Sequence, residues 1–388
     1  MLDAMGIGII VPVTPDLIGE LTDLPVGQAA VWGGYLTFVY AAMQFIFSPT
    51  VGNISDRFGR RPVLLVSLAS LAIDYIIMGF AFSLWMLFLG RFLAGVAGAT
   101  QSTAYAFMAD ISERGKRAQS FGLVGAAFGA GFVLGPLVGG AAGEFGTRVP
   151  FFAAAAIVTA NCLFGLLVLP ESLPAEKRRD FSWARANPFG VAKQIGKFAM
   201  VVWFFAAMFV FNIAHFVYPA VWSFFAKEVF HWSAFDIGLS LTAVGVGFAV
   251  VQGWLIRIII PAFGEAKAAA LGFFVGTLGL AILAFTTAGW VVYLLIPLTA
   301  LGAVISPSIT SLMSNQIPDD AQGELQGALS SVVGMTIIIS PVFMTQLFGF
   351  FTSGEAPVYF PGAPFLAAAL LMGLAVIPFL IGLRRVKS

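Results

Sequence analysis

Two acidic residues and one arginine lie within long apolar runs, where a charge is costly. They are Asp3, Asp74 and Arg91. A charged side chain at lipid depth costs about 2.5–3.5 kcal/mol on insertion scales, so each of the three needs a compensating role. A carboxyl group in such surroundings can bind and release a proton as its environment changes. The residue types therefore indicate proton-coupling chemistry.

The depths of Asp74 and Arg91 within their runs suggest that the two side chains meet. Asp74 follows about twelve apolar residues, which places it about 18 Å from one end of a helix at a rise of 1.5 Å per residue. Arg91 lies about 10 Å from the opposite end of the next helix on the same rise, so in a hydrocarbon core about 30 Å thick the two reach a similar depth. One interpretation is a functional pair, in which Arg91 favours the charged form of Asp74 until the helices shift. The alternative is a structural ion pair that only joins two helices.

Asp3 also has two interpretations. Small residues surround it in the sequence Leu2-Asp3-Ala4-Met5-Gly6-Ile7-Gly8, which allows close helix approach. It is a second proton-site candidate, or it lies in the interfacial end of a shortened helix.

A charged connection, Gly52-Asn53-Ile54-Ser55-Asp56-Arg57-Phe58-Gly59-Arg60-Arg61-Pro62, links two apolar runs. It combines an acid, three arginines and two glycines, and Asp110 stands at the end of another run beside further basic residues. Such a cluster, made and broken between two helical bundles, would act as a latch for an outward-facing state. The alternative is a solvated surface network that contributes little. The latch candidates are Gly52, Asp56, Arg57, Gly59, Arg61 and Asp110.

Glycines recur every four residues in a further apolar run that also holds a proline. This spacing gives a helix smooth faces for tight packing, and the proline removes one backbone hydrogen bond and promotes a kink. A generic packing helix explains the spacing equally well. The residues concerned are Gly131, Gly135, Pro136, Gly139 and Gly140.

Polar and aromatic residues within apolar runs are candidates to line a substrate cavity. The first set is Gln44, Gln101, Tyr105, Asn212, Trp222 and Gln252, and the same reasoning adds Tyr218, Asn315 and Gln326.

The whole composition predicts that membrane helices position these residues. Of the 388 residues, 59% are hydrophobic and 10% charged, and the mean hydropathy is +0.95, whereas about 25% of a soluble domain is charged. Apolar runs near the ~20 residues needed to cross a bilayer recur along the chain. They lie near residues 1–20, 30–52, 62–82, 84–109, 118–141, 149–170, 199–225, 236–260, 266–287, 290–313, 325–350 and 361–383.

These runs predict an all-α membrane protein with 12 transmembrane helices in two pseudo-symmetric six-helix bundles. We expect an N-terminal bundle over residues 1–170, a cytoplasmic linker over 171–198 and a C-terminal bundle over 199–388. The connection after the eighth run weakly repeats the one after the second, and parallel related halves around a midplane site are a transporter design.

The first run begins at Met1, and no cleavable signal is evident. We expect the first helix to be truncated and the natural chain to carry about ten more apolar residues in front.

The distribution of basic residues predicts the orientation. Among the 20 Lys and Arg residues, all except Arg91, Arg148 and Lys227 lie in loops or tails on one side of the predicted spans. The positive side faces the cytoplasm, so both termini are expected inside.

Several function classes are disfavoured. A net charge of +1 without a basic arm gives no indication of nucleic-acid binding, and the single Cys162 cannot form an internal disulfide. His215 and His231 lie far apart without Cys or carboxylate partners at ligand spacing, so we expect neither metal nor cofactor. No nucleophile, base and orienting group occur at plausible spacing, so an enzyme is not expected. The expected partners are a small molecule, protons and the lipid bilayer, and we expect a monomer.

Three motifs together resemble the major facilitator superfamily over essentially the whole chain. The connection from Gly52 to Pro62 resembles its signature between helices 2 and 3. Leu87 to Gly95 resembles its helix-4 arginine motif, and Gly131 to Gly140 its helix-5 antiporter motif. The resemblance implies a 12-helix rocker-switch carrier that exchanges protons for substrate.

Further segments are similar to the bacterial tetracycline/proton antiporters. The resemblance implies function for Asp3, Asp74, Arg91 and Asp110, and a substrate pocket that includes Gln44 and Gln252. The second half departs from the pattern: Phe248 and Gly276 stand where these exporters carry a histidine and an aspartate. This departure argues against tetracycline as substrate and shifts proton coupling to the first half. The segments are Leu2–Gly8, Asp56–Pro62, Asp74–Tyr75, Leu84–Leu87 and Gly139–Glu144.

We therefore expect a secondary transporter of the bacterial inner membrane, an antiporter that exports a small drug-like molecule against inward proton flow. One alternative is a proton-coupled uptake symporter for a sugar or an organic anion. Another is a non-transporting membrane sensor or lipid-handling protein with the same fold.

Overall fold

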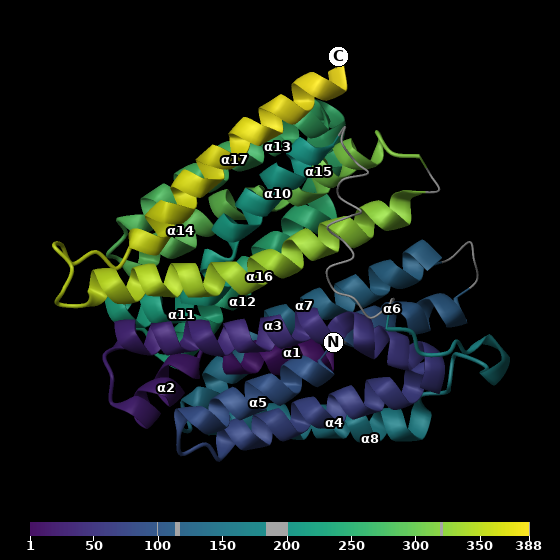
Figure 1. The fold of residues 1–388 in the computed structure, drawn as a ribbon. Helices are drawn as coiled ribbons and strands as arrows, with labels where there is room; N and C mark the ends of the chain where they lie inside the picture. Colours follow the sequence, from purple (N-terminus) through teal and green to yellow (C-terminus); the bar gives the residue numbers. More distant parts are fainter. Residues whose placement is uncertain (99, 113–116, 184–200, 319–320, 388) are drawn as a thin grey trace. The chain divides into compact units, whose positions relative to one another are not determined.

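A computed structural model describes residues 1–98, 100–112, 117–183, 201–318 and 321–387, and these residues contain helices and no strands (Figure 1). The side chains of residues 3, 100–102, 117–119 and 387 lie outside the description. The first half holds α1 (Leu2–Ile10), α2 (Thr14–Thr22), α3 (Val26–Phe58), α4 (Arg60–Gly79), α5 (Leu84–Ala97), α6 (Thr100–Ile111), α7 (Arg117–Gly143), α8 (Val149–Val168) and the short η2 (Ala175–Lys177). The second half holds α10 (Val202–His215), α11 (Val217–Phe230), α12 (Ala234–Val250), the π-helix η4 (Val251–Leu255), α13 (Ile256–Ala284), α14 (Gly289–Ala300), η5 (Leu301–Val304), α15 (Ile305–Ser314), α16 (Gln322–Thr352) and α17 (Ala363–Lys387).

Within the described residues, nine helices are long and apolar enough to cross a membrane, and a bent pair, Ala4–Ile10 with Thr14–Thr22, makes a tenth. One of the nine, Ala234–Ala284, is 51 residues long and is interrupted at Gly264, whose φ of 74° is not helical. It therefore covers two of the predicted runs, and α5 with α6 covers the remaining one. The prediction of an all-α membrane protein is confirmed, and the helices fit the twelve predicted runs.

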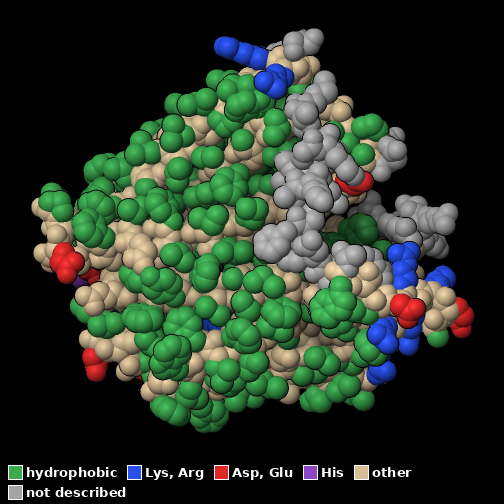
Figure 2. All heavy atoms as spheres, viewed as in Figure 1, with side chains coloured by type: hydrophobic (Ala, Val, Ile, Leu, Met, Phe, Trp, Pro, Cys, Tyr) green, Lys and Arg blue, Asp and Glu red, His purple; other side chains and the backbone are tan. Residues whose placement is uncertain are grey.

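The surface agrees with a lipid environment. Hydrophobic side chains cover the middle of the face shown in Figure 2, whereas Lys, Arg, Asp and Glu side chains gather toward the ends of the helices. Apolar side chains facing lipid lose nothing by exposure, while charged groups there would be costly.

The helices form two compact units. Unit 1 comprises Met1–Leu24, Tyr35–Pro188 and Ser233–Thr242, and unit 2 comprises Pro25–Gly34, Phe189–Trp232 and Ala243–Ser388. Helices α3 and α12 therefore contribute residues to both units. The predicted domain limits at residues 170 and 199 stay a prediction.

Unit 1 is assembled by close backbone approach. Helix α1 packs along α7, and α4 packs between α8 and α5. A methyl group added to Gly135 would lie 2.6 Å from the Met5 carbonyl oxygen, and one added to Gly139 would collide with the Ile9 carbonyl. These glycines allow the two helices to meet backbone to backbone, as small residues do in membrane bundles.

Unit 2 is assembled around aromatic rings. Helix α10 packs on α17 and α16, and α17 packs on α13. Phe365 is fully buried, and its ring lies 4.7 Å from that of Phe225 and 6.2 Å from that of Trp222. Phe273 lies 5.5 Å from Phe379 in the same way. Aromatic pairs at such distances stabilise a core beyond the area they bury.

Candidate functional site

The structure brings Asp74 and Arg91 together as an ion pair inside unit 1. Asp74 comes from α4 and is fully buried, and Arg91 comes from α5 with 12% of its side chain exposed. The Arg91 Nη2 donates to Asp74 Oδ2 and also lies 3.1 Å from the Met78 sulfur. The guanidinium stands over the Tyr40 ring of α3, 5.4 Å from its centroid. The pair therefore joins α4 to α5, and Arg91 also contacts α3.

A glycine makes room for this pair. A methyl group on Gly90, the residue before Arg91, would collide with Asp74 Oδ1. Within the described residues, Asp74 Oδ1 and Arg91 Nε have no hydrogen-bond partner.

The second predicted proton site, Asp3, lies in α1, and its side chain falls outside the described residues. Its helix is nevertheless positioned by α7. A methyl group on Gly131 would collide with the Met1 carbonyl, and Gly8 packs against Pro136. The antiporter-motif residues thus fix the backbone of the segment that carries Asp3.

Two residues of that motif, Pro136 and Gly140, also face α12. A methyl group on Gly140 would lie 2.6 Å from the Ala234 carbonyl oxygen, and Gly238 in turn packs against the Pro136 carbonyl. Thr242 donates a hydrogen bond of 3.0 Å to the Val133 carbonyl. Helix α7 therefore uses one glycine face for α1 and another for the start of α12, all within unit 1.

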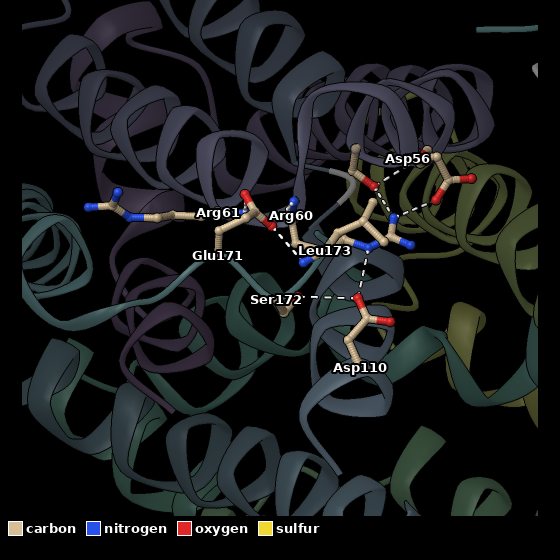
Figure 3. A network of polar contacts seen from close by, with 9 residues as sticks. Asp56, Arg60, Arg61, Asp110, Glu171, Ser172 and Leu173 are labelled. Atoms are coloured by element: carbon tan, nitrogen blue, oxygen red, sulfur yellow. Dashed lines mark hydrogen bonds and ion pairs between the residues drawn. The ribbon is translucent and has the colours of Figure 1, made fainter. Parts of the chain in front are cut away.

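The predicted charged connection is mostly helical, because α3 continues to Phe58 and α4 begins at Arg60. Its side chains form a network centred on Arg60 (Figure 3). The Arg60 guanidinium lies 2.6 Å from Asp56 Oδ1 and 3.4 Å from Asp110 Oδ2. It also donates to the Ser55 hydroxyl at 2.6 Å, and Ser172 donates to Asp110 at 3.2 Å. The predicted candidates Asp56 and Asp110 are thus joined through an arginine that the candidate set omitted.

The other predicted latch residues lie around this network. Arg61 donates to the Leu166 carbonyl at 2.6 Å, and the exposed Arg57 lies over the Phe58 ring. Gly59 has a φ of 107°, which favours glycine. A methyl group on Gly52 would meet no atom within 4 Å, so packing does not require a glycine there.

Glu171 caps the N-terminus of α4, a role that sequence reasoning missed. Its carboxylate accepts hydrogen bonds from the backbone N–H of Arg60 at 2.9 Å and of Arg61 at 3.3 Å. It also accepts one from the Leu173 N–H at 3.0 Å. A methyl group on Gly59 would collide with this carboxylate. A negative charge at a helix N-terminus satisfies free N–H groups and the helix dipole.

The first residues of the predicted linker contact the end of α3 and the start of α4. Asn53 donates to the Ser182 carbonyl at 2.6 Å, and the Arg179 N–H donates to the Asp56 carbonyl at 3.0 Å. Together with Glu171, these bonds fasten residues 171–182 to the ends of α3 and α4. Residues 184–198 of the predicted linker lie outside the described residues.

The predicted cavity residues are spread over both units. In unit 1, the Gln44 amide donates to the Gly98 carbonyl at 3.0 Å, and the Tyr105 ring stands edge-on to Phe121 at 5.6 Å. The Gln101 side chain lies outside the described residues. In unit 2, Asn212 donates to the Met208 carbonyl at 2.7 Å, Trp222 is buried among aromatic rings, and Gln252 is exposed on η4. None of these five described side chains is among the residues that line the cavity of unit 2.

Unit 2 contains a small cavity that includes the predicted Tyr218. Its lining residues are Phe211, His215, Tyr218, Gly276, Leu280, Thr299, Gly302 and Met372. No group of three or more His, Cys, Asp or Glu side chains that could hold a metal occurs in the described part of the chain.

Apolar helical spans, an embedded ion pair and a charged network at the ends of α3, α4 and α6 are features of a multi-pass membrane transporter. A model of the Major Facilitator Superfamily matches residues 1–341. The chain belongs to this superfamily, as the sequence motifs predicted.

Individual relatives cover most of the chain. It is 38% identical over 347 residues to the tetracycline resistance protein of class C from Escherichia coli, covering 89% of this chain and 87% of that protein. It is 37% identical over 347 residues to the class G protein of Vibrio anguillarum, covering 89% and 88%. A solved bacterial homolog of the human lysosomal transporter Spinster has a TM-score of 0.78 at 14% identity, covering 99% of this chain and 94% of that chain. The last similarity supports the fold alone.

Proposed function

We propose that this protein is a proton-coupled antiporter that exports tetracycline or a chemically similar aromatic drug from the cytoplasm. The relatives named as tetracycline resistance proteins support drug efflux over the uptake alternative. These relatives also weigh against the inference that Phe248 and Gly276, which replace a histidine and an aspartate of the tetracycline exporters, exclude tetracycline as a substrate. Tetracycline is therefore the first drug to test.

The observation that carries this function is the buried pair of Asp74 and Arg91. Protonation of Asp74 would neutralise the carboxylate and remove its attraction for Arg91, so the packing of α4 on α5 would no longer be held by charge. A ligand or proton shifts an equilibrium only through a difference between two states. The pair supplies this difference, because charged Asp74 favours the contact between α4 and α5, whereas protonated Asp74 does not.

We place the protein in the bacterial inner membrane with both termini in the cytoplasm, because basic residues predominate on that side. The Arg60 network and Glu171 then lie at the cytoplasmic ends of α3, α4 and α6. In this position they would stabilise one transport state. Asp3 remains a second proton-site candidate, on its sequence context alone.

Transport in everted membrane vesicles tests the proposal. Vesicles are energised to acidify the lumen, tetracycline is added, and the internal pH is followed with a fluorescent probe. We expect drug-dependent proton efflux and a raised drug tolerance of cells that express the protein. A Glu355→Gln variant, which neutralises an exposed loop carboxylate, is the matched control and should transport normally.

The same assay separates the alternatives. An uptake symporter would move protons and substrate in the same direction across the vesicle membrane. A sensor or lipid-handling protein would show no drug-dependent proton movement, and this result with unchanged drug tolerance would contradict the proposal.

A further inference from the structure

Arg91 keeps its positive charge when its partner Asp74 takes up a proton. A guanidinium group is not deprotonated in proteins, and only 12% of the Arg91 side chain is exposed. Removing one charge of a buried pair leaves the other charge uncompensated, which is strongly destabilising. The antiport cycle proposed above therefore requires a second group that holds Arg91 while Asp74 is neutral.

Tyr40 of α3 lies where such a group is needed. Its ring is half-buried, and the Arg91 Cζ lies 5.4 Å from the centroid of this ring. The face of an aromatic ring attracts a cation within about 6 Å, and the attraction is larger where water is excluded. Because the observed distance is near this outer limit, a guanidinium released from Asp74 has room to approach the ring more closely.

Two glycines bring α3 and its Tyr40 ring against the helix that carries Arg91. Gly95 lies one turn after Arg91 in α5, and a methyl group on it would lie 2.6 Å from the Tyr40 carbonyl oxygen. A methyl group on Gly98, the residue that follows α5, would lie 3.2 Å from the Tyr40 hydroxyl oxygen. The two helices therefore meet backbone to backbone within unit 1, as small residues allow in membrane bundles.

The other groups around this pair do not offer Arg91 a partner on a different helix. The Met78 sulfur lies 3.1 Å from its Nη2 but is a weak acceptor, and Tyr75 also interacts with it electrostatically. Both belong to α4, the helix that already holds the carboxylate. Among the helices that pack on α4, α8 contains no Asp, Glu, Lys, Arg or His, and Asp110 of α6 belongs to the charged network at the helix ends. A change of partner between helices therefore involves Tyr40.

We propose that Tyr40 is a positioning residue of the antiport cycle and that it takes over Arg91 when Asp74 is protonated. The guanidinium then moves from a carboxylate on α4 to a ring face on α3, and it returns when the proton leaves. Because the ring stabilises Arg91 beside neutral Asp74, it lowers the proton concentration that the carrier needs. This inference rests on the proposed export function and deepens it.

Melting temperatures in detergent test the change of partner without any transport. Asp74→Asn imitates the protonated acid, so Tyr40→Leu should lower the melting temperature about 2 °C more in this variant than in the wild-type protein. The additional loss should vanish when Arg91→Gln is also present, because no cation remains to be held. A ring that only fills space would cost the same in all three backgrounds, and that result would overturn the proposal.

Drug-dependent proton exchange in everted vesicles provides the second test. Tyr40→Leu should raise the proton concentration at half-maximal exchange about fivefold, a change that corresponds to about 1 kcal/mol, the size of one cation–π contact. Tyr40→Phe keeps the ring face and should stay close to the wild-type value. Phe92→Leu is the control, because it removes an exposed ring next to Arg91 in α5 and should leave this proton concentration unchanged.

Fluorinated phenylalanines at position 40 separate the charge of the ring face from its shape. Each added fluorine withdraws electrons from the ring face while the ring keeps nearly the same size, so the cation–π attraction weakens in steps. The proton concentration at half-maximal exchange should therefore rise in steps from Tyr40→Phe to its most fluorinated form. The same series at position 92 should show no trend.

The outcomes distinguish the two proposals. If the wild-type protein exchanges tetracycline for protons but Tyr40→Leu changes neither the proton concentration nor the melting temperatures as expected, the Tyr40 proposal is wrong and the export function stands. If the wild-type protein moves no protons with the drug, the export function is wrong. The melting temperatures of the Asp74→Asn variants then still decide whether Tyr40 holds Arg91 beside a neutral acid.

Discussion

Units 1 and 2 use different chemistry to hold their helices and to present polar groups. Unit 1 contains the buried pair Asp74–Arg91 and the network around Arg60, and its helices meet through glycine backbones. Unit 2 contains a connected set of aromatic rings and a small cavity among them. Unit 1 therefore joins its helices through charges and glycine contacts, whereas unit 2 joins its helices through aromatic rings.

The largest expected effect comes from breaking the ion pair of unit 1. Asp74→Asn leaves the Arg91 charge buried without its carboxylate, which costs about 3–5 kcal/mol for pairs of this kind. We expect a lower melting temperature and loss of proton-driven drug transport. Thermal unfolding and vesicle transport measure the two effects separately.

The double variant Asp74→Asn with Arg91→Gln separates a coupling role from a structural one. Removing both charges leaves no unpaired ion, so stability should largely return. If the pair couples protons to transport, transport stays absent in this stable protein. Normal transport by the double variant would show that the pair only joins α4 to α5.

The next effect tests whether backbone contact holds unit 1 together. Gly139→Ala places a methyl group against the Ile9 carbonyl, so α1 and α7 must separate. Overpacking of this kind costs about 1–3 kcal/mol. Gly129→Ala is the control in the same helix, because its added methyl group meets no atom within 4 Å and alanine favours a helix.

Thermal unfolding in detergent should show Gly139→Ala well below the wild-type protein and Gly129→Ala equal to or above it. Equal melting temperatures for the two variants would mean that α1 shifts freely along α7. Backbone contact between α1 and α7 would then not be what stabilises unit 1.

A smaller effect is expected at the charged end of unit 1. Glu171→Gln replaces one acceptor oxygen by an amide group that cannot accept from the N–H groups of α4, and it removes a charge at a helix N-terminus. The loss is about 1 kcal/mol. Trypsin should then cleave faster after Arg178 and Arg179, whose segment is fastened beside Glu171. Glu176→Gln, an exposed neighbour in η2, should leave the cleavage rate unchanged.

The fold and part of the site could be predicted from the sequence, because a lipid environment restricts which residue patterns can cross it. Apolar runs must be helices of spanning length, and a charge inside one needs a partner at the same depth, which led to Asp74 and Arg91. The residues that it missed depend on contacts between distant segments. Glu171 caps a helix 111 positions earlier in the chain, and its surroundings in the linker give no sign of this.

The cavity candidates show the same limit. Trp222 and Gln252 both carry a polar group and both lie in apolar runs. Trp222 is buried among aromatic rings, whereas Gln252 is exposed. Spacing along a helix does not tell which neighbour covers each face. The sequence shows only that His215 lacks metal-ligand partners, whereas the structure places it beside the rings of Phe248 and Tyr218, which α12 and α11 bring to it.

The smallest expected effect lies in unit 2, where Tyr359 donates a 2.6 Å hydrogen bond to Glu228 Oε1. Burial and the neighbouring Glu228 carboxylate raise the pKa of Tyr359 to about 12. The folded protein therefore favours the protonated phenol, and the resulting stabilisation is complete below pH 10 and is lost as the pH rises through about 12. Tyr359→Phe should lower the melting temperature slightly at pH 8 and flatten its decline above pH 10. An unchanged alkaline profile in Tyr359→Phe would mean that this exposed bond contributes nothing, leaving unit 2 to be stabilised by its aromatic rings.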